Sequence, residues 1–334
     1  MRKLRIVYMG TPEFAIAPLD ALLKHGFDIA AVVSAPDKPA GRGMKMQQPA
    51  LAHFAQSKAI PLLQPSDMKD EAFLGHLRSF NANLFIVVAF RKLPGVVWQL
   101  PEFGTFNLHA SLLPQYRGAA PINRAIMNGE TQTGITTFFI ADAIDTGKII
   151  LQEAVPILFE DTTGDLHDRL MNEGAALVVR TAQAVAASDF TLLAQDEIMV
   201  PAEALKIAPK IFKEDCLINW EQPVMNIYNQ IRGLSPFPGA FTYLRSPAGR
   251  VLQLKLFAAH IEEGHPACAG NLLSDGKSFL KITAKDGFIV ADELQLEGKK
   301  RLRMSEFMRG FQLDSQWRIC TASELQDQNS HKNG

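Results

Sequence analysis

Short apolar segments alternate with segments of helical spacing through the first half of the chain. Leu4–Met9, Ile29–Val33 and Leu84–Phe90 are apolar runs of the length expected for buried strands. Apolar residues recur with helical spacing over Thr163–Ala187. Strands that alternate with helices are typical of a parallel sheet covered by helices on both faces. The pattern therefore predicts an α/β domain with a doubly wound, mostly parallel sheet.

The pattern changes after a segment of weak periodicity at residues 189–206. Beyond it, turn sequences separate short β-rich runs, which are Phe241–Arg245, Val251–Ala258, Phe279–Thr283 and Phe288–Leu296. Several short strands at this spacing predict a smaller β-barrel domain. We expect a first domain at residues 1–188, a linker at 189–206, the barrel at 207–320 and a polar tail at 321–334.

Composition narrows the class of protein. The chain has 34 Lys plus Arg against 35 Asp plus Glu, and the slight basic excess after residue 205 permits a polyanionic partner there. Its three cysteines are isolated, which favours a reducing compartment over a disulfide framework. No apolar run approaches the roughly 20 residues that span a bilayer. We expect a soluble, cytoplasmic protein without a membrane partner.

Two classes of enzyme are disfavoured by missing motifs. A dinucleotide site requires Gly-x-Gly-x-x-Gly after the first strand, but Gly10 has no glycine partner until Gly26. A metal hydrolase requires clustered metal ligands, but the eight histidines are scattered along the chain. We therefore expect no metal.

Three polar side chains occupy positions where a reaction site is expected. Asn107 and His109 are two residues apart on a predicted strand, Thr105–His109, so their side chains share a face. Ligands of such sheets bind outside the carboxyl ends of the strands. Asp145 follows a second predicted strand, Gly134–Ile140, and reaches the same edge if that strand runs parallel to the others. Singly, each residue is more often structural, and Asp-Thr-Gly is an ordinary turn sequence.

Together, the amide, the imidazole and the carboxylate suit transfer of an acyl group between nitrogens. Asn107 and His109 can donate hydrogen bonds to the oxygen that becomes negative during attack. Asp145 can hold His109 in one tautomer or accept the amine proton through water. Ser111 lacks the Gly-x-Ser-x-Gly surroundings of a nucleophile, so we expect its hydroxyl to order the loop.

The segments that carry these residues resemble the folate-dependent formyltransferase family. They are Asn107–Ala110, Ser111–Pro121 and Asp145–Gly147, and Met9–Ala15 is similar to the family's opening segment. The resemblance covers essentially the whole chain. It implies that Asn107, His109 and Asp145 surround the formyl group of 10-formyltetrahydrofolate. It further implies that the acceptor is the methionine amine of initiator methionyl-tRNA and that the tail is an OB-like barrel in contact with that tRNA.

The resemblance also suggests binding residues. For the folate co-substrate they are Ser111, Leu112, Leu113, Pro114, Phe90 and Val88. Arg91 follows Phe90 at a point where many family members have an aromatic residue and then Gly. The resemblance therefore does not determine the backbone at the rim of the folate pocket. For tRNA phosphates they are Arg42, with Lys38 and Lys45, in the polar segment 34–48. The alternative for that segment is a solvated loop.

Two other functions stay open at this point. One is a formyltransferase for a sugar nucleotide or another small amine on the same scaffold. The other is a noncatalytic RNA- or folate-binding protein. The basic residues of segment 34–48 and of the tail favour the RNA substrate. We expect a monomer.

Overall fold

The computed structural model describes residues 2–40, 45–311, 313, 316–320 and 324. The chain folds into two units, each built from more than one stretch of sequence. Unit 1 comprises Met1–Pro121, Gln132–Pro156 and Leu166–Pro209, and unit 2 comprises Ile122–Thr131, Ile157–Asp165 and Lys210–Gly334. Among the described residues no helix is long and apolar enough to cross a membrane.

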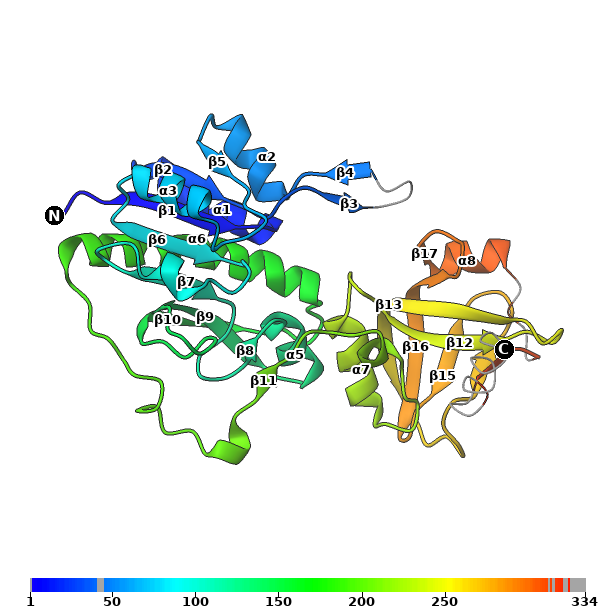
Figure 1. Cartoon of the computed structure of the whole chain (residues 1–334). Helices are drawn as coiled ribbons and strands as arrows, with labels where there is room; N and C mark the ends of the chain where they lie inside the picture. The colour runs from blue at the N-terminus through cyan, green and yellow to red at the C-terminus, as the bar shows by residue number, and fades with distance from the viewer. Residues whose placement is uncertain (1, 41–44, 312, 314–315, 321–323, 325–334) are drawn as a thin grey trace. The chain divides into compact units, whose positions relative to one another are not determined.

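A seven-stranded sheet of order β10-β9-β7-β6-β1-β2-β5 forms the centre of unit 1 (Figure 1). The pairs from β7 to β5 are parallel, whereas β9 is antiparallel to both β7 and β10. This confirms the mostly parallel sheet. The strands are β1 (Arg5–Gly10), β2 (Asp28–Val33), β5 (Leu62–Leu63), β6 (Leu84–Val88), β7 (Thr105–His109), β9 (Gln132–Phe139) and β10 (Ile149–Pro156).

Helices bury the apolar residues of this sheet. Val7, Phe85 and Val87 pack with Leu74 and Leu77 of α3 in one cluster. The longest helix, α6, spans Thr163–Ala187 as its spacing predicts. The other helices of this part of the chain are η1 (Glu13–Ala15), α1 (Ile16–Lys24), α2 (Ala50–Ser57), α3 (Glu71–Ser79), α4 (Gly95–Trp98) and α5 (Pro121–Met127).

Two short pairs of strands lie outside the large sheet. β3 (Lys38–Ala40) and β4 (Lys45–Gln47) form an antiparallel hairpin, although the sequence indicates only a polar loop here. The second pair joins β8 (Arg117–Gly118) to β11 (Ile207–Ala208), which follows η2 (Ala202–Ala204). Both pairs are labelled in Figure 1. The segment after α6 therefore returns to the residues that follow β7.

Unit 2 is an antiparallel, nearly closed barrel with a helix packed on it. Its strands run in the order β14-β15-β16-β13-β12-β18, and β17 pairs with β16. They are β12 (Ala240–Arg245), β13 (Val251–Glu263), β14 (Leu272–Ser274), β15 (Leu280–Thr283), β16 (Gly287–Leu296), β17 (Leu302–Arg303) and β18 (Arg318–Ile319). η3 (Glu214–Cys216), α7 (Val224–Gly233) and α8 (Met304–Gly310) complete the unit. The four predicted β-rich runs are confirmed as strands.

A buried arginine joins α7 to residues 157–165 within unit 2. The Arg232 guanidinium donates to Asn229 Oδ1 at 2.9 Å and to the Asp161 carbonyl at 3.1 Å. Burial lowers the pKa of Arg232 from its ordinary value. Because its hydrogen bonds are satisfied by neutral acceptors, this arginine is a structural element of the unit.

Candidate active site

β7 carries two of the three candidate catalytic residues. In register, Asn107 pairs with Val87 of β6 and Phe138 of β9, and His109 pairs with Thr136 of β9. A Cβ on Gly174 would lie 2.7 Å from Leu108 Cδ2, so Leu108 packs against α6. Asn107 and His109 therefore share the opposite face of the strand. Asn107 is half-buried, whereas His109 is 7% exposed.

The ring of His109 is fixed by a backbone carbonyl. Its Nε2 lies 2.9 Å from the oxygen of Tyr116. Because a carbonyl oxygen only accepts hydrogen bonds, Nε2 carries a proton and donates it. Nδ1 is then the nitrogen that faces the Asp145 carboxylate, 3.9 Å from Oδ2. The pair is close enough for electrostatic interaction but too far apart for a direct hydrogen bond.

Asp145 reaches His109 from a loop. The carboxyl-end argument for Asp145 requires a parallel strand before it, and β9 is antiparallel to β7. The difference arises because β9 and β10 form a hairpin, whose connecting residues bring Asp145 back towards His109. The Gly118 amide donates to Asp145 Oδ2 at 2.9 Å. His109 and Asp145 thus meet through the loop that connects β9 to β10, and not at the carboxyl ends of two parallel strands.

A close approach fixes the end of the Asp145 turn. A Cβ added to Gly147 would lie 1.6 Å from the Phe139 carbonyl oxygen. No side chain fits there, so glycine is required where this turn rejoins the hairpin. Asp145 itself has φ +56, in the left-handed region that Asp tolerates better than most residues.

A second hydrogen-bond network orders the loop after His109. Ser111 is fully buried, and its hydroxyl donates to the Gln115 carbonyl at 2.6 Å. Thr136 Oγ1 donates to the Ser111 carbonyl at 2.6 Å, and Gln152 Nε2 donates to the Leu113 carbonyl at 3.0 Å. The polar groups of this loop are therefore satisfied within unit 1.

Comparisons with known proteins identify the family. Residues 3–182 match the family described as formyl transferase, and residues 210–312 match the formyl transferase C-terminal domain. The chain belongs to the formyl transferase family. It is 50% identical over 317 residues to a methionyl-tRNA formyltransferase of Bacteroides thetaiotaomicron, covering 95% of this chain and 98% of that protein. An enzyme of the same name from Flavobacterium johnsoniae is 48% identical, covering 96% and 100%.

Solved structures share the fold of this formyl transferase. An N-formyltransferase of Helicobacter canadensis, crystallised with folinic acid and dTDP-3-aminofucose, has a TM-score of 0.61 at 21% identity. The match covers 87% of this chain and 99% of that chain. HypX of Aquifex aeolicus in complex with tetrahydrofolic acid also has a TM-score of 0.61, at 17% identity, covering 96% and 51%. At these identities the likeness establishes the fold alone.

Most residues suggested for folate binding have buried side chains in this formyl transferase. Val88, Ser111 and Leu113 are 1% exposed or less, and Pro114 is also buried. Phe90 and Leu112 are half-buried. Ala89, exposed between Val88 and Phe90, has φ +48, and Arg91 donates to the carbonyls of Pro65 and Ser66. Ligand contacts by the suggested residues would thus involve backbone atoms or the half-buried side chains of Phe90 and Leu112.

Two of the three residues suggested for tRNA contact lie on the β3–β4 hairpin. Lys38 begins β3 and pairs in register with Gln47. Lys45 begins β4, and Arg42 lies outside the described residues. The hairpin projects from the sheet of unit 1 (Figure 1), and the side chains of Lys38, Pro39, Met46 and Gln47 are exposed.

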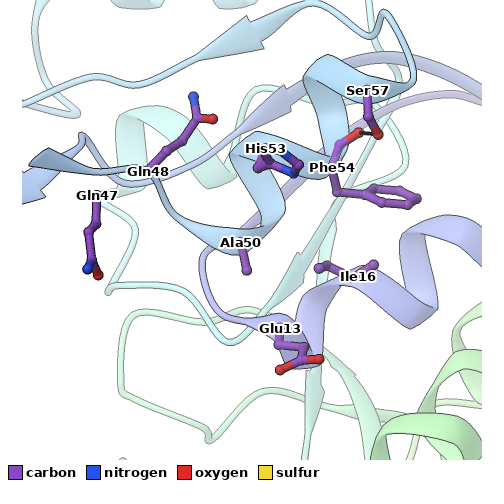
Figure 2. A pocket seen from close by; sticks show the side chains of 8 residues that line it. All are labelled: Glu13, Ile16, Gln47, Gln48, Ala50, His53, Phe54 and Ser57. Carbon is purple, nitrogen blue, oxygen red and sulfur yellow. Dashed lines mark hydrogen bonds between the residues drawn. The ribbon is translucent and has the colours of Figure 1, made fainter.

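An open hollow of about 810 Å³ lies beside this hairpin. Figure 2 shows its lining: Glu13 and Ile16 come from η1 and α1, Gln47 and Gln48 from the end of the hairpin, and Ala50, His53, Phe54 and Ser57 from α2. None of Asn107, His109 and Asp145 lines it. The hollow is therefore separate from the candidate catalytic residues.

The sequence assigns no role to three residues that bond to His109 or to the Asp145 turn, which are Tyr116, Gly118 and Gln195. Tyr116 and Gly118 act through backbone atoms, and their only signal in the sequence is that they lie in the segment Ser111–Pro121. Gln195 lies in the segment of weak periodicity, where nothing marks it as buried, yet it is 5% exposed.

Proposed function

We propose that this formyl transferase moves the formyl group of 10-formyltetrahydrofolate to the methionine amino group of initiator methionyl-tRNA. The observation that carries the proposal is identity near 50%, over 95% of the chain, to enzymes named methionyl-tRNA formyltransferase. The arrangement of an amide, an imidazole and a carboxylate in unit 1 is consistent with this chemistry.

The reaction forms one carbon–nitrogen bond and breaks another. The amine nitrogen attacks the formyl carbon, the formyl oxygen gains negative charge, and the bond to the folate nitrogen breaks as that nitrogen receives a proton. An α-amino group has a pKa of about 8, so part of it is neutral at cellular pH. The site therefore needs donors for the oxygen and an acceptor for the amine proton, not a strong base.

We assign the stabilisation of the negative formyl oxygen to Asn107 and His109. The half-buried Asn107 carboxamide can donate an N–H to the developing oxyanion. Nε2–H of His109 already binds the Tyr116 carbonyl, so the ring donates to substrate only when Nδ1 also carries a proton. The Asp145 carboxylate, 3.9 Å from Nδ1, would stabilise that charged ring.

Asp145 is also the proposed acceptor for the amine proton. Its Oδ2 is held by the Gly118 amide, and the tautomer of His109 is already set by Tyr116. The carboxylate is therefore not needed to select the tautomer. A water between Asp145 and the amine would complete the transfer of the proton.

The test of the proposal is product formation. The purified protein is incubated with 10-formyltetrahydrofolate and methionyl initiator tRNA, and the released amino acid is analysed by mass spectrometry. We expect formylmethionine in amounts equal to the tetrahydrofolate produced. Folded protein that forms no product from charged initiator tRNA would refute the proposal.

Amino-sugar nucleotides serve as competing acceptors in the same assay. The Helicobacter canadensis structure contains dTDP-3-aminofucose, but the likeness to it extends to the fold alone. We expect no formylation of that compound by this chain. A higher kcat/KM for it than for methionyl-tRNA would favour the small-amine function. Tight tRNA binding without any transfer would favour a noncatalytic role.

Several properties follow as predictions within this proposal. Residues 1–188 would supply the catalytic part, and the barrel at 207–320 would contact tRNA. Lys38, Arg42 and Lys45 would contact phosphates. Val88, Phe90 and residues 111–114 would bind the folate. We propose a cytoplasmic monomer that requires no metal.

A further inference from the structure

Gln195 is a buried polar residue in an otherwise irregular segment of unit 1. It lies between α6 and η2, outside any helix or strand, and is 5% exposed. A buried carboxamide has two donors and an acceptor to satisfy. The partners of Gln195 therefore reveal what it holds.

All four hydrogen bonds of the Gln195 side chain go to the two loops around His109. Nε2 donates to the Asp145 carbonyl at 2.9 Å and to the Gly147 carbonyl at 2.8 Å. Oε1 accepts from Arg117 Nε at 3.0 Å and from Arg117 Nη2 at 2.6 Å. Because carbonyls only accept and a guanidinium only donates, the orientation of the amide is dictated by its partners.

These hydrogen bonds join Asp145 to the segment Arg117–Gly118, which binds its carboxylate. Arg117 precedes Gly118, whose amide donates to Asp145 Oδ2 at 2.9 Å. Gln195 bridges Arg117 to the backbone of Asp145, which is held at φ +56. Asp145 is thus fixed both at its backbone carbonyl and at its carboxylate oxygen Oδ2. Nδ1 of His109 lies 3.9 Å from that Oδ2.

We propose that Gln195 is a positioning residue for formyl transfer, which acts by holding Asp145 in the place from which its carboxylate faces His109. The proposal rests on the proposed function, because the role of Asp145 belongs to it. Gln195 does not touch the reacting atoms. Its effect should therefore fall on turnover rather than on the affinity for either substrate.

Gln195→Glu separates this role from simple packing. Glu has almost the same size, and its carboxylate can still accept from Arg117. It cannot donate to the carbonyls of Asp145 and Gly147, and it places negative charge against them. If Gln195 only filled space, Gln195→Glu would lower stability and leave kcat unchanged.

The kinetic test compares Gln195→Glu with Asn83→Ala. Asn83 is a matched control: its amide donates to Lys3 O at 3.0 Å and accepts from Arg5 N at 2.8 Å, next to the amino ends of β1 and β6. We expect Gln195→Glu to lower kcat by about 10- to 100-fold with both KM values within about twofold. Asn83→Ala should lower the melting temperature and leave kcat within about twofold. A folded Gln195→Glu enzyme with wild-type kcat would overturn the proposal.

A double-mutant comparison tests whether Gln195 acts through Asp145. In an Asp145→Asn enzyme the carboxylate is already lost, so adding Gln195→Glu should lower kcat by less than about twofold more. A full further loss would show that Gln195 acts elsewhere, which contradicts the proposal. If Gln195→Glu does not fold, Gln195→Asn retains the amide at a shorter reach. It should lower kcat by about threefold to tenfold, and wild-type turnover would contradict the proposal.

Amide hydrogen exchange provides a readout that does not depend on activity. The Gly118 N–H is protected by Asp145 Oδ2, so release of Asp145 should speed exchange at Gly118 about tenfold or more. We expect this in Gln195→Glu and not in Asn83→Ala, and unchanged exchange would refute the proposal. Wild-type protein that forms no product defeats the proposed function alone, because the exchange measurement still decides whether Gln195 holds Asp145.

Discussion

Gly118 donates its backbone amide to the Asp145 carboxylate at a distance of 2.9 Å, across 27 positions of sequence. Gly118 has φ +129, and a Cβ there would lie 2.4 Å from the Ala208 carbonyl oxygen. Both the conformation and the space therefore require glycine at the point where β8 meets β11. The hydrogen bond to the carboxylate oxygen, one of the two supports of Asp145, depends on this backbone geometry.

Gly118→Ala should damage both stability and turnover. The new methyl group must push β11 away or rotate Gly118, and either movement displaces the amide from Asp145. We expect a loss of about 2 kcal/mol in the free energy of unfolding and a fall of about tenfold in kcat. Urea unfolding and steady-state kinetics measure the two effects. Gly26→Ala is the control, because Gly26 has φ +75 but open space around it, and it should lower stability alone.

Asn107→Ala should lower kcat by about 10²- to 10³-fold, because one donor to the oxyanion is lost. The KM for tRNA should change little, since Asn107 is assigned to the reacting oxygen. Asn107→Asp should be slower still, because a carboxylate repels negative charge that develops on that oxygen. Steady-state kinetics with both substrates distinguishes the variants. Comparable activity of Asn107→Asp and the wild type would rule out the assigned role.

Replacing Lys38, Arg42 or Lys45 with Ala should weaken tRNA use without slowing the chemical step. Each change removes one proposed phosphate contact, so we expect the KM for tRNA to rise about threefold to tenfold near 0.1 M salt. The slope of log KM against log salt should decrease by about one for each residue. The exposed Lys69 is the control, and Lys69→Ala should have neither effect. An unchanged KM in all three variants would contradict tRNA contact by this hairpin.

The stability of unit 2 should depend on Asp215 in a defined range of pH. A hydrogen bond from the Phe212 amide, and then one from Arg124, hold the pKa of the Asp215 carboxyl below its ordinary value of 3.8. A lowered pKa in the folded state means that the stabilisation is fully present above pH 3.8 and is lost as the pH falls through the folded value.

Asp215→Asn should therefore reduce the free energy of unfolding by about 1 kcal/mol at pH 7. The difference from the wild type should shrink as the pH falls below 3.8. Urea unfolding at a series of pH values measures it. Glu221→Gln, at an exposed position of the same unit, should leave stability unchanged. A difference for Asp215→Asn that is constant down to pH 2 would contradict the assigned cause.

Local patterns predict the elements of this fold better than their mutual arrangement. The helical spacing over Thr163–Ala187 matches α6, and the apolar run from Leu84 coincides with β6, because burial sets both patterns. Strand direction leaves no such signal. β9 alternates apolar and polar residues as a strand of either direction would, so its antiparallel pairing with β7 comes only from the structure.

In the candidate site, too, the sequence predicts what lies within one element but not the contacts between distant segments. Asn107 and His109 share a strand, and strand periodicity places them on one face. The supports of Asp145 depend on contacts between distant segments, such as the bonds from Gln195 across about 50 positions. A buried glutamine in an irregular segment has the composition of a loop, so no local pattern distinguishes it.

The pairing of β11 with β8 determines where a shortened form of this protein can end. Lys206 and Ala208 supply carbonyls to the amides of Tyr116 and Ala119, at 2.6 and 2.7 Å. A fragment cut after α6 would lose these partners together with Gln195, although every proposed catalytic side chain would remain. Crystallisation or ligand screening of the sheet unit in isolation therefore requires a boundary no earlier than Pro209.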